Sequence, residues 1–369
     1  MHMPNKIDMM EATRLTREGR LEEAVALLRR AVGTEPGAGL EAGLVAGAAQ
    51  SGASVSDYLS DSLKGFFAPP APAPAGTPGR DDGAFRDHVY ANAAGSRTYK
   101  LYVPSRYGKK PLPLLVMLHG CTQSPDDFAA GTRMNEVAEE HGLLVAYPAQ
   151  VQSANASKCW NWFNAADQKR GQGEPSLIAG ITRDVMANYA VAPGRVYVAG
   201  LSAGGAVAAI LGTTYPDLYA AIGVHSGLAC GAASDMSSAF TAMRQGGAVP
   251  FVSTADGARG GAIVPTIVFH GDRDNTVHPT NGEHVVAQSK GGATLDEAVT
   301  RGTSPDGTAY SRRILSDRRG RAVLEHWVLH GLGHAWSGGS QQGSYADPRG
   351  PDASREMVRF FLQHTRIED

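Results

Sequence analysis

Short apolar runs alternate with amphipathic stretches along most of the chain. Residues 112–118 form an almost continuous apolar run, as expected for a strand that is covered on both faces of a sheet. Similar short runs predict further strands at residues 143–147, 195–199, 220–224 and 266–269. Amphipathic stretches predict helices at residues 126–141, 176–189, 205–211, 280–289 and 352–364. This alternation predicts an α/β fold, with a mostly parallel central sheet and helices on both faces.

Two pairs of segments interrupt the alternation and predict neighbouring strands without a helix between them. Residues 85–90 and 97–103 predict a hairpin across a turn at residues 92–95, which ends in glycine. Residues 310–315 and 322–329 predict a second strand pair late in the chain. In parallel sheets of this kind, functional groups collect at the carboxyl ends of the strands. We therefore expect the functional residues in the loops that follow the parallel strands.

The pattern changes near residue 83, which predicts a boundary between an N-terminal segment and the α/β domain. Residues 1–66 are predicted to be helical and partly disordered, because apolar residues recur at helical spacing only between residues 21 and 32. Residues 67–82 are rich in proline and alanine and are predicted to form an extended linker. Residues 83–369 are then the α/β catalytic domain.

Composition and charge exclude several classes of function. The 369 residues include 34 Lys and Arg and 36 Asp and Glu, giving a net charge of −2, so no nucleic-acid partner is expected. No run reaches the roughly 20 apolar residues of a membrane span. Residues 1–30 are studded with charge and lack the apolar core of a signal peptide, which favours a cytoplasmic location. The oligomeric state stays open.

The sequence Gly-Leu-Ser-Ala-Gly at residues 200–204 lies between a predicted strand and a predicted helix. A Gly-x-Ser-x-Gly in this context is typical of a nucleophile elbow, a tight turn that presents the hydroxyl of its serine, here Ser202. Glycines at both ends allow neighbouring backbone to approach closely. The alternative is a turn without chemistry, because a chain with 45 glycines can produce the pattern by chance.

A serine nucleophile needs a base and an acid that orients the base, and in this fold they follow the serine in the order acid, histidine. The strand at residues 266–269 is followed by Asp272 and Asp274, and either could be the acid. These acids could instead cap a turn. His334 follows the last predicted strand and is the expected base, whereas His326 and His330 lie nearer that strand and are alternatives.

An oxyanion hole needs two backbone N–H donors. Ala203, after the serine, is expected to supply one, and Cys121 or Thr122, in the loop after residues 112–118, the other. Cys121 as a nucleophile is a weaker alternative, because no acid stands ready to orient His119 and no elbow presents the thiol.

Three tryptophans are candidate walls of a substrate pocket, although aromatic side chains pack in cores more often than they line clefts. Trp160 and Trp162 flank an asparagine in one short segment, and Trp336 lies two residues after His334. Neither a His-Glu-x-x-His pattern nor a zinc-type cysteine spacing occurs, and no dinucleotide or P-loop motif is present. No metal and no cofactor are therefore expected.

Four segments together resemble the polyhydroxybutyrate-depolymerase-type esterases, which are α/β-hydrolases related to feruloyl and acetylxylan esterases. They read LHGCTQ at residues 118–123, CWNWF at 159–163, RVYVAGLSAGG at 195–205 and GLGHAWSGG at 331–339. The resemblance runs from about residue 85 to the end of the chain.

The resemblance implies a role for several residues. It implies Ser202 as nucleophile, His334 as base and Asp274, rather than Asp272, as the orienting acid. It implies oxyanion donors near Cys121 and Ala203. It also suggests that Cys121 and Cys159 approach each other, as a disulfide between the two loops that carry them.

The expected function is that of a serine esterase acting on ester or polyester substrates, chiefly short-chain polyhydroxyalkanoate polymer or oligomers. One alternative is an acetylxylan or feruloyl carbohydrate esterase, which shares the chemistry and differs in the pocket. A second alternative is a non-catalytic binding protein on a hydrolase scaffold. Secreted family members carry a leader and often a polymer-binding module. We expect neither in this chain, which favours soluble oligomers, amorphous polyester or small esters as substrates, and secretion stays open.

Overall fold

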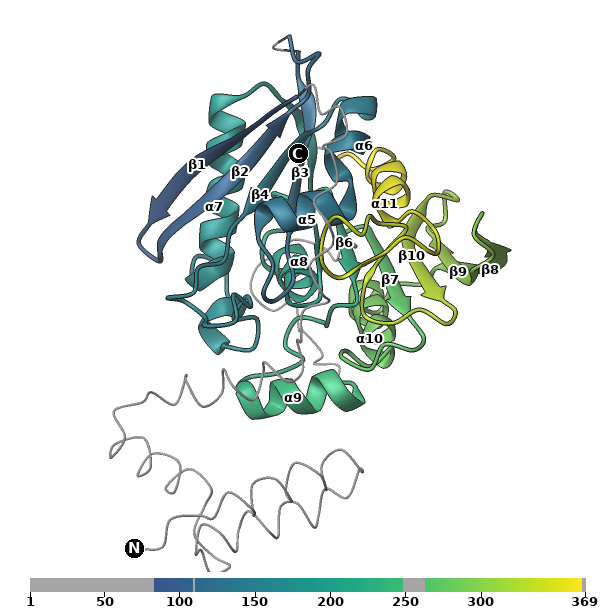
Figure 1. Ribbon diagram of the computed structural model, residues 1–369. Coiled ribbons are helices and arrows are strands. Elements are labelled where there is room, and N and C mark those ends of the chain that lie inside the picture. Colours follow the sequence, from purple (N-terminus) through teal and green to yellow (C-terminus); the bar gives the residue numbers. More distant parts are fainter. Residues whose placement is uncertain (1–82, 109, 248–262, 367–369) are drawn as a thin grey trace, which may run out of the picture. The chain divides into compact units, whose positions relative to one another are not determined.

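The computed structural model describes residues 83–108, 110–247 and 263–366 (Figure 1). The predicted N-terminal segment at residues 1–66 and the linker at residues 67–82 lie outside the described residues. Within the described part, a ten-stranded sheet has the strand order β1-β2-β4-β3-β5-β6-β7-β10-β9-β8. Its strands are β1 (Ala84–Asn92), β2 (Gly95–Val103), β3 (Leu112–Leu118), β4 (Leu144–Pro148), β5 (Val191–Leu201), β6 (Ala221–His225), β7 (Thr266–Gly271), β8 (Asp296–Thr303), β9 (Ala309–Ser316) and β10 (Ala322–Leu329).

The centre of the sheet is parallel and its two ends are antiparallel. Strands β4, β3, β5, β6, β7 and β10 are parallel neighbours. The hairpin β1–β2 adds to β4 at one end, and β9 and β8 add to β10 at the other, all antiparallel. The chain passes from β3 to β4 on one side and then returns to β5 on the other side of β3. This reversal of strand order is where open α/β sheets form their ligand sites.

Helices cover both faces of the sheet (Figure 1). They are α5 (Pro125–Thr132), α6 (Met134–His141), α7 (Gly173–Asn188), α8 (Ala203–Thr214), α9 (Met236–Gln245), α10 (Thr280–Lys290) and α11 (Ala353–Phe361). Successive strand residues point to opposite faces. In β6, Ile222 packs beside Gly212 of α8, whereas the next residue, Gly223, packs against Met357 and Phe361 of α11. Helices α8 and α11 therefore lie on opposite faces, as predicted for an α/β fold.

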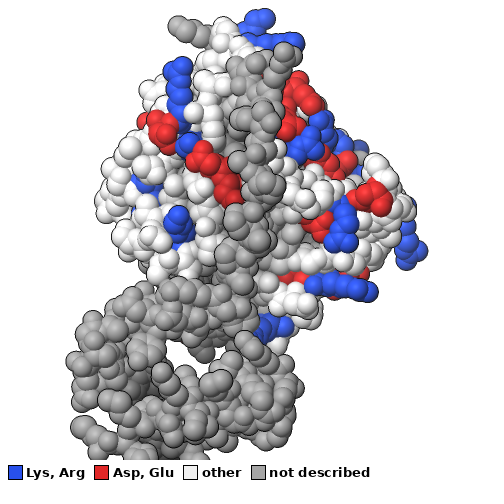
Figure 2. All heavy atoms as spheres, viewed as in Figure 1, with Lys and Arg blue, Asp and Glu red and all other residues white. Residues whose placement is uncertain are grey.

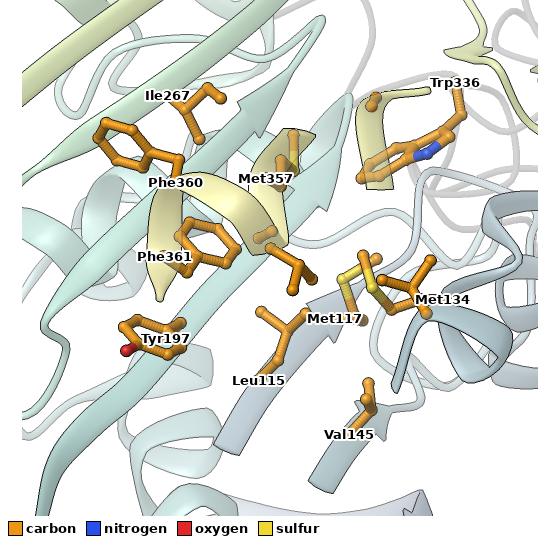
Figure 3. Close-up of a cluster of buried hydrophobic side chains, with 14 of the residues drawn as sticks. Leu115, Met117, Met134, Val145, Tyr197, Ile267, Trp336, Met357, Phe360 and Phe361 are labelled. Atoms are coloured by element: carbon orange, nitrogen blue, oxygen red, sulfur yellow. The ribbon is translucent and has the colours of Figure 1, made fainter. Parts of the chain in front are cut away.

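A large apolar core fills the space between the sheet and helices α6 and α11. Figure 3 shows its aromatic and sulfur-containing side chains, among them Met134, Met357, Phe360 and Phe361. Phe361 stacks on Tyr197 of β5, with ring centroids 5.1 Å apart. Burial of this apolar area supplies the main driving force for folding. The core fixes the central strands, and with them the loops at their carboxyl ends.

One predicted helix differs in the structure, and two further elements were not predicted. The single helix predicted at residues 126–141 is broken at Arg133, which has a left-handed φ of 54° and ends α5. Strand β8 was not predicted, because seven of its eight residues are exposed and it lacks the alternation of a half-buried strand. Helix α9 was also not predicted. It begins with a reciprocal capping interaction between Asp235 and Ser238.

Charged side chains of both signs are interspersed on the face of the molecule in Figure 2. Among the described residues, no helix combines the length and apolar character that a membrane crossing requires.

Candidate active site

Ser202 occupies a strained turn between β5 and α8. Its backbone has φ 57° and ψ −119°, a conformation that is costly for a residue with a side chain. A Cβ at Gly204 would overlap the carbonyl of Leu118, and a Cβ at Gly200 would overlap the backbone of Gly204. Only glycine fits at either position, so the tight strand-to-helix turn predicted from the sequence is present. Ser202 lies at its apex and is 4% exposed.

His334 and Asp274 form a close pair at the same edge of the sheet as Ser202. Asp274 follows β7 and His334 follows β10, and these two strands are parallel neighbours, so the loops at their carboxyl ends meet. His334 Nδ1 lies 2.7 Å from Asp274 Oδ2. The other carboxylate oxygen, Oδ1, accepts hydrogen bonds from the amides of Thr276 (2.9 Å) and Val277 (2.8 Å). These two bonds fix the carboxylate so that its second oxygen faces the imidazole.

The environment of Asp274 keeps its carboxyl group ionised. Burial raises the pKa of Asp274, but the facing imidazoles of His334 and His270 lower it by more than burial raises it. The pKa of this carboxyl group therefore lies below its ordinary value. His270 Nε2 is 3.4 Å from the same Oδ2. An ionised carboxylate selects the His334 tautomer that carries its proton on Nδ1, which leaves a lone pair on Nε2.

Asp272 belongs to a separate pair. Its carboxylate accepts hydrogen bonds from the amide of Gly331 (2.7 Å) and from His330 Nδ1 (2.9 Å), and His330 Nε2 contacts Ser311 Oγ at 2.9 Å. The third candidate histidine, His326, is buried beside Glu283. The structure therefore pairs Asp274 with His334 and Asp272 with His330.

The loop after β3 lies against the serine turn. The point where Gly120 would carry a Cβ is 3.6 Å from the Cβ of Ser202. The amide of Thr122 donates to the carbonyl of Ser157 at 2.7 Å, so it is already engaged. In contrast, the amides of Cys121 and Ala203 donate to no other described residue, and Ala203 opens α8, where an N–H has no partner within the helix. The role of these two amides as oxyanion donors stays a prediction.

Gln123, the last residue of the LHGCTQ segment, was not predicted to have a role, and it holds this loop in place. Its Oε1 accepts the amide of Gly120 at 2.9 Å, and its Nε2 donates to Asp127 Oδ2 and to the carbonyl of Ser344. His119 is also a structural group. Burial lowers the pKa of its imidazole to about 4, so the ring is neutral at pH 7.

Cys121 and Cys159 form a disulfide, with their Cα atoms 4.2 Å apart, as the family resemblance suggested. It joins the loop after β3 to the segment that carries Trp160. The third cysteine, Cys230, is buried and unpaired.

A thiol count should detect this bridge. We expect one titratable thiol, that of Cys230, when the protein is unfolded without reductant and alkylated, and three after reduction. Three thiols in the unreduced sample, taken from an oxidising preparation, would contradict the bridge.

Two of the three candidate tryptophans are not placed as the sequence predicted. Trp160 and Trp336 have exposed fractions of 0% and 1%, and their indole N–H groups donate to the carbonyl of His119 and to Ser354 Oγ. Trp336 lies in the core of Figure 3. The prediction that these two side chains line a substrate pocket is wrong, because neither offers surface to a ligand. Trp162 packs edge-on against Phe163 and keeps a small exposed area, so its role stays a prediction.

No group of three or more His, Cys, Asp or Glu side chains could hold a metal ion within the described part of the chain.

Comparison with known proteins places this site in a family. Residues 97–302 match the model of the family described as "Esterase PHB depolymerase". The chain is 34% identical over 228 residues to poly(3-hydroxyalkanoate) depolymerase C of Paucimonas lemoignei, covering 60% of this chain and 54% of that protein. It is 28% identical over 259 residues to feruloyl esterase B of Thermothelomyces thermophilus, covering 66% and 84%. It is also 29% identical over 202 residues to acetylxylan esterase A of Talaromyces purpureogenus, covering 52% of each. The chain thus spans about half the length of two of these relatives.

Among solved structures, the acetyl xylan esterase from Aspergillus awamori superposes with a TM-score of 0.60 at 20% identity. The superposition covers 76% of this chain and 100% of that one, which supports the predicted α/β-hydrolase fold. Since the family match extends over more than half of the sequence, the chain belongs to the PHB depolymerase esterase family of the α/β-hydrolases.

Proposed function

We propose that this protein is a serine esterase that hydrolyses carboxylic esters, with Ser202 as nucleophile, His334 as base and Asp274 as the acid that orients the base. The observation that carries the proposal is the 2.7 Å pair of Asp274 and His334 at the same sheet edge as the strained turn of Ser202. Family membership supports it, because the curated relatives are esterases and polyester depolymerases.

The chemistry proceeds in two balanced steps. Ser202 Oγ attacks the ester carbonyl carbon while His334 Nε2 takes the hydroxyl proton, and the carbonyl oxygen becomes an anion. The amides of Cys121 and Ala203 donate to this oxyanion. The intermediate then collapses, the alcohol leaves with the proton from His334, and an acyl-enzyme remains. Water then attacks the carbonyl carbon of the acyl-enzyme while His334 Nε2 takes one of its protons. The second intermediate collapses, the carboxylic acid leaves, and Ser202 Oγ regains its proton from His334.

The proposed substrates are short-chain hydroxyalkanoate esters, as oligomers or amorphous polymer. The support is the match to the family and to the Paucimonas lemoignei depolymerase, which has the highest identity among the three curated relatives described above. The feruloyl and acetylxylan esterases among the relatives support a carbohydrate esterase as the second candidate. Both candidates use the same catalytic groups, and they differ in what binds beside them.

A substrate panel separates the two candidates. We expect kcat/KM for 3-hydroxybutyrate oligomers to exceed that for acetylated xylan and for methyl ferulate by at least about tenfold, equivalent to about 1.4 kcal/mol of transition-state binding. Product release would be followed by chromatography, with a Ser202→Ala sample as the blank. Faster release of acetate from xylan, or of ferulate from methyl ferulate, would contradict the hydroxyalkanoate assignment and leave the esterase chemistry intact.

A further inference from the structure

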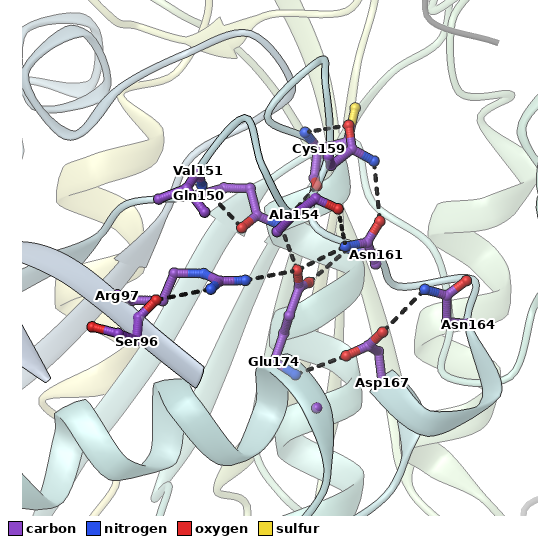
Figure 4. Close-up of polar contacts among 12 residues, drawn as sticks. Ser96, Arg97, Gln150, Val151, Ala154, Cys159, Asn161, Asn164, Asp167 and Glu174 are labelled. Carbon is purple, nitrogen blue, oxygen red and sulfur yellow. Dashed lines mark hydrogen bonds and ion pairs between the residues drawn. The ribbon is translucent and has the colours of Figure 1, made fainter. Parts of the chain in front are cut away.

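A buried carboxylate, that of Glu174, lies outside the candidate catalytic residues. Glu174 is the second residue of α7 and is 4% exposed. Its Oε2 accepts the amide of Asn161 at 2.7 Å (Figure 4). Its Oε1 accepts Asn161 Nδ2 (2.9 Å), Arg97 Nη2 (3.4 Å) and Gln150 Nε2. Four donors from three residues, which lie in two separate segments of the chain, thus converge on one carboxylate.

A charge buried in this way is expensive and requires compensation. Burial raises the pKa of the Glu174 carboxyl, while the donors and the guanidinium of Arg97 favour its ionised form. The N-terminal turn of α7 favours negative charge as well. A buried ion pair is often no more stabilising than well-packed apolar side chains. Stability alone therefore does not explain the buried charge of Glu174. The segments to which its donors belong suggest a role for it.

Two of the donor residues, Gln150 and Asn161, belong to the segment at residues 150–164, here called the tryptophan loop. This segment follows β4 and contains no helix or strand before the short 3-10 turn at its end (Ala165–Gln168). Gln150 Nε2 also donates to the carbonyl of Cys159 at 3.0 Å. Asn161 is the neighbour of Trp160. Glu174 therefore fixes the tryptophan loop on either side of Cys159 and Trp160.

The tryptophan loop is in turn tied to residues 119–123, here called the oxyanion loop. Four direct links join the two segments, which are the disulfide Cys121–Cys159 and the hydrogen bonds from Trp160 Nε1 to the carbonyl of His119 (3.0 Å), from the amide of Gln150 to His119 Nε2 (3.1 Å) and from the amide of Thr122 to the carbonyl of Ser157 (2.7 Å). A shift of the tryptophan loop must therefore move the oxyanion loop.

We propose that Glu174 is a positioning residue, which sets the Cys121 amide at the oxyanion by anchoring the tryptophan loop to α7. The proposal rests on the esterase function proposed above. An oxyanion donor acts on charge that develops in the transition state, so its effect depends steeply on where it points. A loosened anchor should therefore weaken transition-state binding more than substrate binding.

Glu174→Gln is the sharpest single change. The amide oxygen of glutamine takes the place of Oε1, where three donors converge, and its NH₂ group then faces the amide of Asn161. Two donors cannot bond to each other, so the contact with the Asn161 backbone is lost and the tryptophan loop is released beside Trp160. The side-chain volume stays the same, so no cavity forms.

For Glu174→Gln we expect kcat for p-nitrophenyl butyrate to fall about tenfold, less than the loss of a whole oxyanion donor, while KM changes by less than about threefold. The affinity for a boronic acid, which forms a tetrahedral adduct on the serine, should fall in parallel with kcat. The matched control is Asp184→Asn, because Asp184 is a carboxylate on the same helix whose hydrogen bonds among the described residues go to Tyr99 Oη and Asn188 rather than to either loop. It should leave kcat within about twofold of the wild type.

A folded Glu174→Gln protein with unchanged kcat, or with equal losses for Asp184→Asn, would overturn the positioning role. If Glu174→Gln does not fold, Asn161→Ala decides, since it removes the Nδ2 donor to Glu174 and keeps the backbone amide that donates to Oε2. It also removes two bonds within the tryptophan loop, from Asn155 Nδ2 to Asn161 Oδ1 and from Asn161 Nδ2 to the carbonyl of Ala154. A kcat reduced about threefold at unchanged KM supports the proposal, and an unchanged kcat overturns it. Ser202→Ala, run alongside, separates the two proposals: activity that survives in Ser202→Ala refutes the esterase mechanism itself.

Discussion

Ser202→Ala should lower kcat for p-nitrophenyl butyrate by about four to six orders of magnitude, because the acyl-enzyme cannot form without the hydroxyl. The residual rate should come from the oxyanion donors alone. A fluorophosphonate should label the wild-type protein and leave the variant unlabelled. A non-catalytic binding protein on this scaffold would show neither turnover nor labelling, even with Ser202 in place.

The backbone at this position offers a second, independent test of the nucleophile. Ala keeps the strained φ of 57°, whereas Gly relieves it. Ser202→Gly should therefore lose as much activity as Ser202→Ala but be more stable than Ser202→Ala by about 1 kcal/mol, measured by denaturant unfolding. A more stable, inactive variant is the result expected where strain is maintained for function.

Ser226→Ala is the matched control for these variants. Ser226 is a fully buried serine with a positive φ of 50°, directly after β6. We expect its substitution to lower kcat by no more than about tenfold. Near-normal turnover in Ser202→Ala, or a loss in Ser226→Ala that equals it, would refute Ser202 as the nucleophile.

Local patterns in the sequence predicted the central fold well. The runs at residues 112–118 and 322–329 have the bounds of β3 and β10, because both strands are buried and apolar throughout most of their length. The break falls on Arg133, which is neither glycine nor proline, and Gly131 two residues before it stays within α5, so the position of the break could not be predicted from the sequence. Strand β8 is an exposed edge whose pairing with β9 depends on a hairpin rather than on its own hydrophobic pattern.

The candidate site, like the fold, could be predicted from the sequence only in part. The turn around Ser202 was visible because its requirements lie within five residues. Asp272 and Asp274 are only two residues apart, so local pattern could not choose between them, and their partners depend on the loop after β10. Residue type could not reveal that Trp160 and Trp336 face the interior. Glu174 has the sequence of an ordinary acidic residue in a first helical turn, and only the folded chain brings its four donors together.

Asp274→Asn should lower kcat by about four orders of magnitude, whereas Asp272→Asn should lower it by less than about tenfold. The amides of Thr276 and Val277 both donate to Asp274 Oδ1, so an asparagine at this position must place its carbonyl oxygen there. Its NH₂ group then points at His334 Nδ1 and forces the imidazole into the opposite tautomer, with the proton on Nε2. In that tautomer the ring cannot accept the proton of Ser202.

Asp272→Asn provides the matched control, since the same substitution two residues away removes the same charge from the same loop. Asp272 accepts Gly331 N and His330 Nδ1 and is partly exposed, so asparagine keeps one of these bonds and solvent replaces the other. Steady-state kinetics of the two purified variants, with melting temperatures to verify folding, decide the assignment. A greater loss for Asp272→Asn would transfer the role of the acid to Asp272 and its base to His330. Equal losses would mean that the loop after β7, rather than one carboxylate, orients His334.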